Sequence, residues 1–470
     1  MAKRAKSARS RRALVSWRGS HLFVKLSGTA MVLAACLGSG AWASGQQPAP
    51  PPESPSAPSA LTPGELYKQA MHPLDVVRSS MDNWSDTEMS AFLVGVRMAK
   101  EACGQASPET YGGDDLYDLA RLCSLGQDWN AANTAATRYL DSRAEPHRTQ
   151  AFALSINALM HLNGADLAVQ TAHSMMENQP FDAEAAYALR YLKEALEQAG
   201  DPSAAYLAQS EHAEIVKALQ NGTALKAAHG EAVMSLGTLY ESAMELAFWQ
   251  RYRHRDADAA TTANDIDEAL AKGAALSAED RLRIEAVRTQ YALLGKPLPA
   301  LKTTAVDEPP RLKGKTAAAQ LSRSQPPAQI GPDFGAATVL VVFPDWCPQC
   351  RKMMKALTEF GAANKTTPIH AYGLMFLDDP AALDQTAEEK RAAHEQSLRD
   401  VQGTNTLVVD GKDARALGIL DFPLGIVLDH EGKVRFVGVL PADAFSGNGY
   451  IGKVLVRMTG GAAASTPQAP

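Results

Sequence analysis

A Cys-Pro-Gln-Cys motif at positions 347–350 has the residue types and spacing best suited to chemistry in this sequence. It follows the apolar run 338–343 and precedes 351–360, a stretch with helical periodicity. At such a strand-to-helix junction the first sulfur lies at a helix N-terminus, where unpaired N–H groups and the helix dipole stabilise an anion. Because a thiolate is the form that attacks disulfides, we predict that Cys347 is the nucleophile and Cys350 the buried resolving thiol.

Two other roles are open to a cysteine pair of this spacing. It could be half of a zinc site, but four-coordinate zinc needs a second pair of ligands at similar spacing. Cys103 and Cys123 lie far upstream, and His370 and His394 are single, so no metal is expected. The pair could also form an inert structural disulfide.

Two segments resemble the thioredoxin family. "VLVVFPDWCPQCRKMMKAL" is similar to its active-site strand and helix, with Trp346 directly before the first cysteine. In "ARALGILDFPLGIVLDHEGKVRFVG", Phe422-Pro423 precedes a strand, a turn and a second strand. The resemblance covers about the last 130 residues and is closest to the extracytoplasmic TlpA-like branch.

The resemblance implies a catalytic site without a cofactor, formed by Cys347, Cys350 and Pro423. It implies that Pro423 is cis and faces the dithiol, with Trp346 and Phe422 in supporting positions. One departure concerns proton transfer, because Val341 stands where thioredoxin has a buried aspartate.

The acceptor for the proton of the resolving thiol is therefore unidentified from the sequence. Asp345 lies near the motif. It could shuttle a proton, or it could be a solvated loop carboxylate.

The N-terminus has the layout of an export signal. Residues 1–52 contain no acidic residue, and the first twenty-five include eight basic ones. The apolar run 26–37 is too short to span a membrane. Two cleavage sites compete: Ala-Trp-Ala at 41–43, or Leu-Ala-Ala-Cys at 33–36, which resembles a bacterial lipobox and would leave a lipidated, membrane-anchored Cys36. Either site predicts an extracytoplasmic protein in the periplasm or cell envelope.

Charge and cysteine number agree with export. Loss of the eight N-terminal positive charges would change the net charge from −6 to about −14. Such a chain offers phosphate groups no electrostatic attraction, so no binding to nucleic acid is expected. Without Cys36, four cysteines remain, and an even number in an oxidising compartment favours two pairs, Cys347 with Cys350 and Cys103 with Cys123.

Between residue 63 and about residue 300 the sequence predicts helices only, because apolar residues recur at spacings of three and four. Gly-containing breaks at 126–128, 164–166 and 200–202 recur at intervals of 38 and 36 residues. This pattern is similar to tetratricopeptide repeats, whose helix pairs must stack to bury their apolar faces. An irregular helical bundle is the alternative.

The predicted fold is multidomain, an all-α helical-repeat module followed by an α/β thioredoxin-like domain. The predicted layout is a signal peptide at 1–43, a disordered Pro-rich linker at 44–62, the helical-repeat domain at 63–300, a linker at 301–329, the thioredoxin-like domain at 330–459 and a disordered tail at 460–470. The predicted elements of the last domain are strands at 338–343, 370–376, 406–409, 424–428 and 434–439 and helices at 351–360 and 387–401.

These features predict an exported thiol–disulfide oxidoreductase that acts on cysteines of other exported proteins. A cofactor-free dithiol must be recharged, so a membrane redox partner is expected, and the helical module would bind partners. A non-enzymatic helical-repeat scaffold with a vestigial or structural thioredoxin-like domain is the alternative. A thiol peroxidase is disfavoured because no motif for peroxide activation surrounds Cys347.

Overall fold

A computed structural model describes most of the chain downstream of the predicted export signal. The described residues are 61–80, 86–142, 144–228, 232–273, 276–306, 329–330, 337–363, 369–377, 387–446 and 449–460. The predicted signal peptide with Cys36 lies outside them, as do most of the two predicted linkers and residues 461–470 of the predicted tail. No helix among the described residues is both long enough and apolar enough to cross a membrane.

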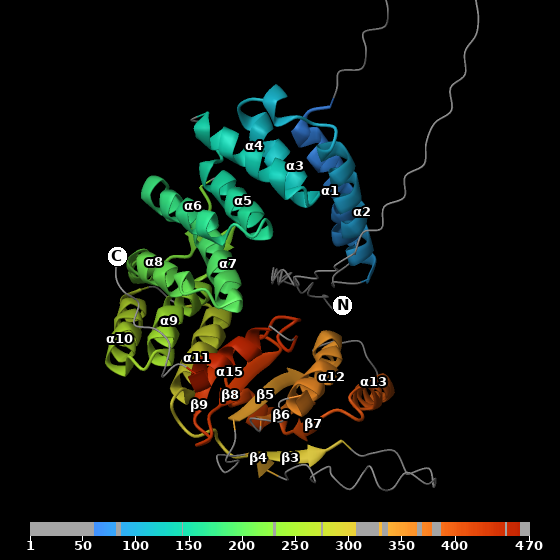
Figure 1. Cartoon of the computed structure of the whole chain (residues 1–470), viewed down its shortest axis with the longest axis vertical. Coiled ribbons are helices and arrows are strands. Elements are labelled where there is room, and N and C mark those ends of the chain that lie inside the picture. Colours follow the sequence, from blue (N-terminus) through green and yellow to red (C-terminus); the bar gives the residue numbers. More distant parts are fainter. Residues whose placement is uncertain are drawn as a thin grey trace, which may run out of the picture. The chain divides into compact units, whose positions relative to one another are not determined.

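Helices dominate the chain from residue 63 to residue 293 (Figure 1). They are α1 Pro63–Ser80, α2 Asp86–Cys103, α3 Asp114–Leu125, α4 Trp129–Asp141, α5 Arg148–His161, α6 Ala165–Asn178, α7 Ala183–Ala199, α8 Ser203–Asn221, α9 Leu236–Tyr252, α10 Asp256–Lys272 and α11 Ala278–Leu293, with a 3-10 turn at Pro108–Thr110. One departure from the prediction of helices only is a short antiparallel ladder between α8 and α9, formed by β1 (Leu225–Lys226) and β2 (Val233–Met234).

The three Gly-containing breaks all lie between two helices of a pair, α3 with α4, α5 with α6, and α7 with α8. At these turns Gln127, Asn163 and Gly200 have positive φ angles of 60°, 59° and 81°. In each case the next N–H donates to the carbonyl five residues earlier, at 2.9, 2.8 and 2.8 Å, which is a Schellman helix end. His254, with φ of 59°, repeats this geometry between α9 and α10.

Neighbouring helix pairs stack through buried apolar faces. Contacts join α1 to α3, α3 to α5 and α5 to α7, in addition to the contacts between successive helices. Small side chains fill much of this interface, and Ala132, Ala135 and Ala136 of α4 are completely buried. Because a single helix pair of this length cannot bury its apolar face, stacking is the source of the core in this region.

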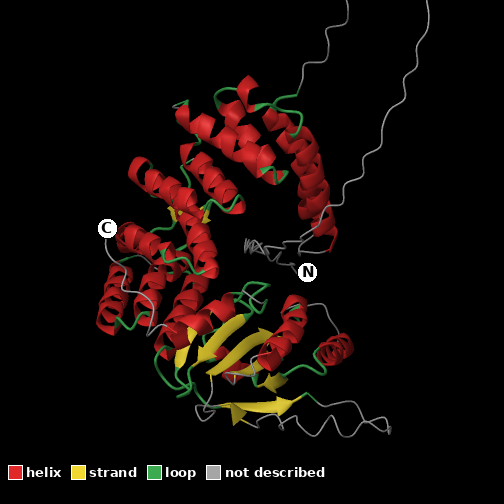
Figure 2. Ribbon diagram, in the orientation of Figure 1, coloured by secondary structure: helices red, strands yellow, loops and turns green. Residues whose placement is uncertain are grey.

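The C-terminal part contains a seven-stranded mixed sheet, shown in yellow in Figure 2. Its strands are β3 Leu301–Ala305, β4 Gln329–Ile330, β5 Ala337–Pro344, β6 Ile369–Phe376, β7 Thr406–Val409, β8 Leu424–Leu428 and β9 Val434–Val439, in the spatial order β4-β3-β7-β6-β5-β8-β9. Its helices are α12 Pro348–Ala363, α13 Ala387–Asp400, α14 Gly411–Arg415 and α15 Tyr450–Gly460. Strands β5, β6 and β7 are parallel, and their neighbours β3 and β8 run antiparallel to them. The edge strands β4 and β9 pair antiparallel with β3 and β8.

The sheet is wider than the sequence predicts. Leu301–Ala305 was expected to lie in a linker, but it forms β3, which pairs with β7 more than a hundred residues later. The end of the same predicted linker, Gln329–Ile330, pairs with β3 as β4. Helices α14 and α15 were also missed, although Ile451, Val454 and Leu455 of α15 have helical spacing and are buried.

Both faces of the central strand β5 are buried, and each face is covered by different helices. Val339, Val341 and Phe343 pack with residues of α12 and α15. Leu340 and Val342 point the other way and pack with α14, with the end of α11 and with the segment that follows it.

The helical part and the sheet therefore share a hydrophobic core. Leu293, Leu294 and Leu298 are buried against the sheet, and the backbone of this segment bonds to β9, where Gly295 N–H donates to the Val434 carbonyl at 2.8 Å. The predicted border at residue 300 runs through this core.

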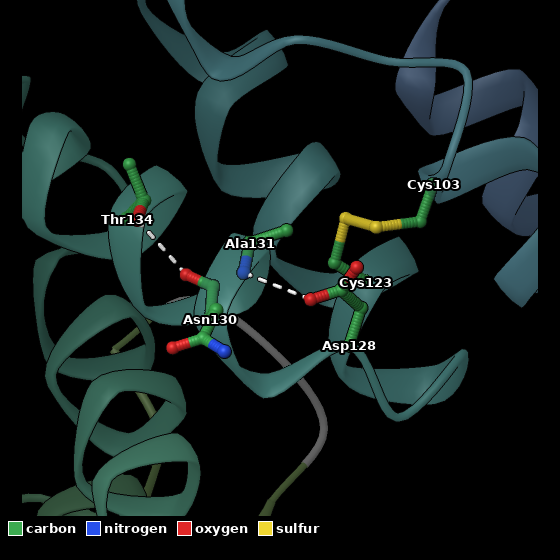
Figure 3. The surroundings of a disulfide bond; sticks show 6 residues. All are labelled: Cys103, Cys123, Asp128, Asn130, Ala131 and Thr134. Carbon is green, nitrogen blue, oxygen red and sulfur yellow. Dashed lines mark hydrogen bonds between the residues drawn. A yellow bond between two sulfur atoms is a disulfide. The ribbon is translucent and has the colours of Figure 1, made fainter. Parts of the chain in front are cut away.

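Figure 3 shows the disulfide between Cys103, at the end of α2, and Cys123, in α3. The two sulfurs are 2.03 Å apart and the two Cα atoms 5.1 Å apart. Both residues are buried, and the bond joins two successive helices. Five residues after Cys123, the Asp128 carboxylate accepts a hydrogen bond from Ala131 N–H at 3.1 Å and caps α4.

We predict that the Cys103→Ala/Cys123→Ala variant loses about 3 kcal/mol of unfolding free energy, because the bond closes a loop of twenty residues in the unfolded chain. Urea unfolding followed by helical circular dichroism measures this loss. The matched control is Cys347→Ala/Cys350→Ala, whose bond closes a much shorter loop. Equal losses in the two variants, or free thiols at both positions in non-reducing peptide mapping, would contradict the prediction.

Candidate active site

Cys347 and Cys350 form a disulfide at the N-terminus of α12, with the sulfurs 2.01 Å apart. Cys347 immediately precedes the helix and is half-buried, whereas Cys350 is completely buried. The backbone N–H of Cys350 donates to Cys347 Sγ at 3.2 Å. The sulfur of Cys347 thus occupies the position of an N-cap acceptor, where a helix N–H stabilises negative charge.

The local sequence explains why the chain turns at this point. The apolar strand β5 ends at Pro344, and Cys347 N–H donates to the Pro344 carbonyl at 3.1 Å to close the turn. Pro348 then takes the first position of α12, where its missing N–H and fixed φ favour helix initiation. Strand, turn and helix start together hold Cys347 at the edge of the sheet.

The second predicted motif lies at the same edge. Leu424, the first residue of β8, pairs with Val342 of β5, so the preceding Pro423 stands beside the end of β5. The Phe422-Pro423 bond is cis, as the resemblance implied. The ring of Phe422 packs edge-on against Trp346, with centroids 5.3 Å apart, and Trp346 is 41% exposed. This aromatic contact joins the residue before Cys347 to the residue before Pro423.

Asp345 is not a solvated loop carboxylate, contrary to one of the two roles considered from the sequence. The residue is only 6% exposed. Its carboxylate lies 2.9 Å from His394 Nδ1, its N–H donates to the Phe376 carbonyl at 3.0 Å, and its carbonyl accepts from Arg351 Nη1. Burial of this side chain is stabilised by those contacts. Val341 lies in the apolar core, completely buried.

Sequence reasoning missed several residues around the site. His394 was treated as an isolated histidine, and nothing in the spacing of 49 residues links it to Asp345. Arg351 of α12 pairs with Asp400 of α13 at 3.0 Å, a second polar contact of α13 near the cysteines. Arg283 of α11 lies 3.3 Å from the carboxylate of Asp421, just before Phe422. The described part of the chain holds no group of three or more metal-ligating side chains placed to bind an ion.

Comparison with known proteins points to thiol chemistry. The chain is 29% identical over 157 residues to the thiol:disulfide interchange protein DsbE of Pseudomonas aeruginosa, covering 32% of this chain and 69% of that protein. It is 28% identical over 147 residues to the protein of the same name from Yersinia pestis, covering 31% and 64%. About a third of this chain is homologous to thiol:disulfide interchange proteins. No protein-family model matches the chain.

A solved structure is similar to this chain over about the same share of its length. It is the thioredoxin domain of a thiol-disulfide oxidoreductase from Bacteroides vulgatus, with 20% identity and a TM-score of 0.20. The match covers 31% of this chain and 88% of that one. This chain spans about two thirds of the length of the two sequence relatives, and they match about a third of its own length.

We predict that the two cysteines have unequal roles. Cys347→Ser should abolish disulfide exchange, whereas Cys350→Ser should leave an accessible nucleophile that accumulates mixed disulfides. The reason is burial, since Cys350 is inaccessible and Cys347 accepts a helix N–H at its sulfur. Both variants are purified from the compartment in which the protein folds, and reductant-sensitive adducts are counted on non-reducing gels. Equal adduct yields from the two proteins would show that the roles are wrong.

Proposed function

We propose that this protein is an extracytoplasmic thiol–disulfide oxidoreductase that exchanges disulfides with cysteines of exported proteins. The observation that carries the proposal is the hydrogen bond from Cys350 N–H to Cys347 Sγ at an accessible helix N-terminus. The homology to thiol:disulfide interchange proteins supports it. So does the position of Pro423 at the same edge of the sheet, after Phe422, which contacts the exposed Trp346.

The proposed exchange needs only the two sulfurs and a substrate disulfide. The Cys347 thiolate attacks one substrate sulfur, forms a mixed disulfide and releases the other substrate sulfur as a thiolate, which takes up a proton. Cys350 then loses its proton and attacks Cys347 Sγ, which releases the second substrate thiol. Two electrons pass from the dithiol to the substrate, and the reverse sequence oxidises a substrate dithiol. A membrane redox partner would return the pair to its starting state.

We further propose that the helical region is a tetratricopeptide-like module that binds partners next to the dithiol. Its four turns of one geometry and its stacked helix pairs support a repeat. Its last helix also reaches the loop before the cis proline. In addition to the Arg283–Asp421 ion pair, Gln290 Nε2 donates to the Gly418 carbonyl at 2.7 Å.

Gly418 shows how closely this loop approaches α11. Its φ is +75°, and a Cβ at this position would lie 2.5 Å from the Ala286 carbonyl oxygen. The loop 418–423 is therefore packed directly on the helical module. We infer that the module contributes to the surface that presents Pro423 to a protein substrate.

Arg283→Met tests this role together with the activity. The reduced variant should reduce a protein disulfide about fivefold more slowly than the wild type, because a partly exposed ion pair contributes about 1 kcal/mol. Reduction of a small disulfide such as oxidised glutathione should change less, because it needs only the sulfurs. The rates are measured by following free thiols released with time.

Arg281→Met is the matched control, because Arg281 lies on the same helix and is exposed. Equal losses for the small and the protein substrate, or an equal loss in Arg281→Met, would count against a role for the module in substrate binding. Absence of turnover in the wild type with either substrate would instead favour a helical-repeat scaffold with an inert dithiol.

We propose that the mature protein starts after an export signal, at Cys36 or at Ser44. The basic N-terminus, the apolar run 26–37 and the small residues before each cleavage site support this proposal. Intact-mass spectrometry of the protein from its native cells should give one of these two N-termini, with a lipid added in the first case. Active protein that retains Met1 would overturn export.

A further inference from the structure

We propose that His394 controls the charge beside the nucleophile, through its pairing with Asp345, and so acts as a positioning residue for the Cys347 thiolate. The inference rests on the proposed function, since it concerns the reactivity of the same dithiol. It assigns to helix α13 a role that the sequence did not suggest.

The first observation is that Asp345 is held through all of its polar groups. Its N–H is bonded to β6, its carbonyl to Arg351 of α12, and its carboxylate to His394 of α13. Its side chain is 9% exposed, so the carboxylate cannot turn to solvent without breaking the pair. A carboxylate is thus fixed two residues before Cys347, in a largely buried position.

The second observation concerns the other charges near the pair. Arg351 lies 3.0 Å from the carboxylate of Asp400, so α12 and α13 are joined by a second ion pair. The positive charge of Arg351 and the negative charge of Asp400 largely cancel. On the exposed face of α13, Glu395 pairs with Arg391 and Arg399 at 4.0 and 3.9 Å. Among the described groups packed at this junction, the imidazole is the one whose type changes charge near neutral pH.

The sign of the effect follows from these charges. When His394 is protonated, the imidazolium compensates the Asp345 carboxylate, and a thiolate at Cys347 meets less negative potential. When His394 loses its proton, the carboxylate charge acts on the thiolate without that compensation, and the thiol form is favoured. Protonation of His394 and formation of the thiolate therefore promote each other, as linkage requires.

Asp345 does not occupy the position of the buried aspartate of thioredoxin, where this chain has Val341. Val341 is enclosed by apolar side chains. The described ionisable pair beside the cysteines is Asp345, in the loop 345–347, with His394 of α13. We infer that a cation at position 394 favours the Cys347 thiolate by compensating the Asp345 carboxylate.

The test is the pH profile of Cys347 alkylation in the reduced full-length protein. Iodoacetamide rates are measured from about pH 4 to pH 9, with the modified cysteine identified by mass spectrometry. His394→Gln should move the midpoint of the profile up by about half a unit to one unit, because the carboxylate loses its cationic partner. His394→Arg, which keeps a cation at every pH, should return the midpoint to the wild-type value or below.

His430→Gln is the matched control, since that histidine lies in the β8–β9 turn with its side chain 78% exposed. Asp345→Asn completes a double-mutant cycle. In the Asp345→Asn background, His394→Gln should no longer move the midpoint, because the effect passes through the carboxylate.

A wild-type midpoint in His394→Gln, or the same shift in His430→Gln, would overturn the inference and leave the proposed function standing. So would a shift that persists at full size in the Asp345→Asn background, because it would come from altered packing. Failure of Cys347 to react in the wild type at any pH would overturn both the inference and the proposed function.

Discussion

Burial of both faces of the central strand β5 is the constraint on which the rest of the structure depends. Successive side chains of β5 point to opposite faces of the sheet, and both faces are apolar. A parallel strand with two apolar faces must be covered on both sides. Helices α12 and α15 cover one face, and the end of α11 with α14 covers the other. The end of β5 is fixed by this packing, and the loop 345–347, which carries Cys347, begins at that end.

The candidate site arises where several elements end at one edge of the sheet. The loop directly after β5 contains Asp345 and Cys347. Pro423 directly precedes β8 and lies beside the end of β5, because Leu424 pairs with Val342. Helix α13 adds His394 to the buried carboxylate. Cys347 and Cys350 therefore lie at an edge where the loop 418–423 contacts α11 and the loop 345–347 contacts α13. Each loop is tied to its helix by an ion pair or charged hydrogen bond rather than by apolar packing alone.

The helical region and the sheet are joined through a core and not through a free linker. The chain passes from the end of α11 to the start of β3 within eight residues, bonding to β9 on the way. Leu294 and Leu298 are buried in the same cluster as Leu340 and Ile426. A force or ligand that moved α11 would act on the loop 418–423, because Gly418 allows the backbone of that loop to touch the helix.

The sequence alone determined the features that depend on local pattern. Apolar runs, turn residues and the resemblance located five of the seven strands, with β7, β8 and β9 at the observed bounds. Recurrent glycine breaks located the turns of three helix pairs, because helix ends need residues that accept positive φ. The dithiol and the proline before a strand could be recognised from a few adjacent residues.

Tertiary structure decided what depends on distant partners. The sequence of β3 has no pattern that distinguishes it from a linker. It forms a strand because its backbone pairs with β7. The local sequence does not show whether Asp345 is solvated or buried. The contact with His394 of α13, at 2.9 Å, depends on the tertiary structure. The border between helices and sheet was equally undetermined, because an apolar segment such as 291–301 does not specify which core it joins. The physical reason is the same in each case: burial and pairing are properties of two surfaces, and the local sequence describes only one of them.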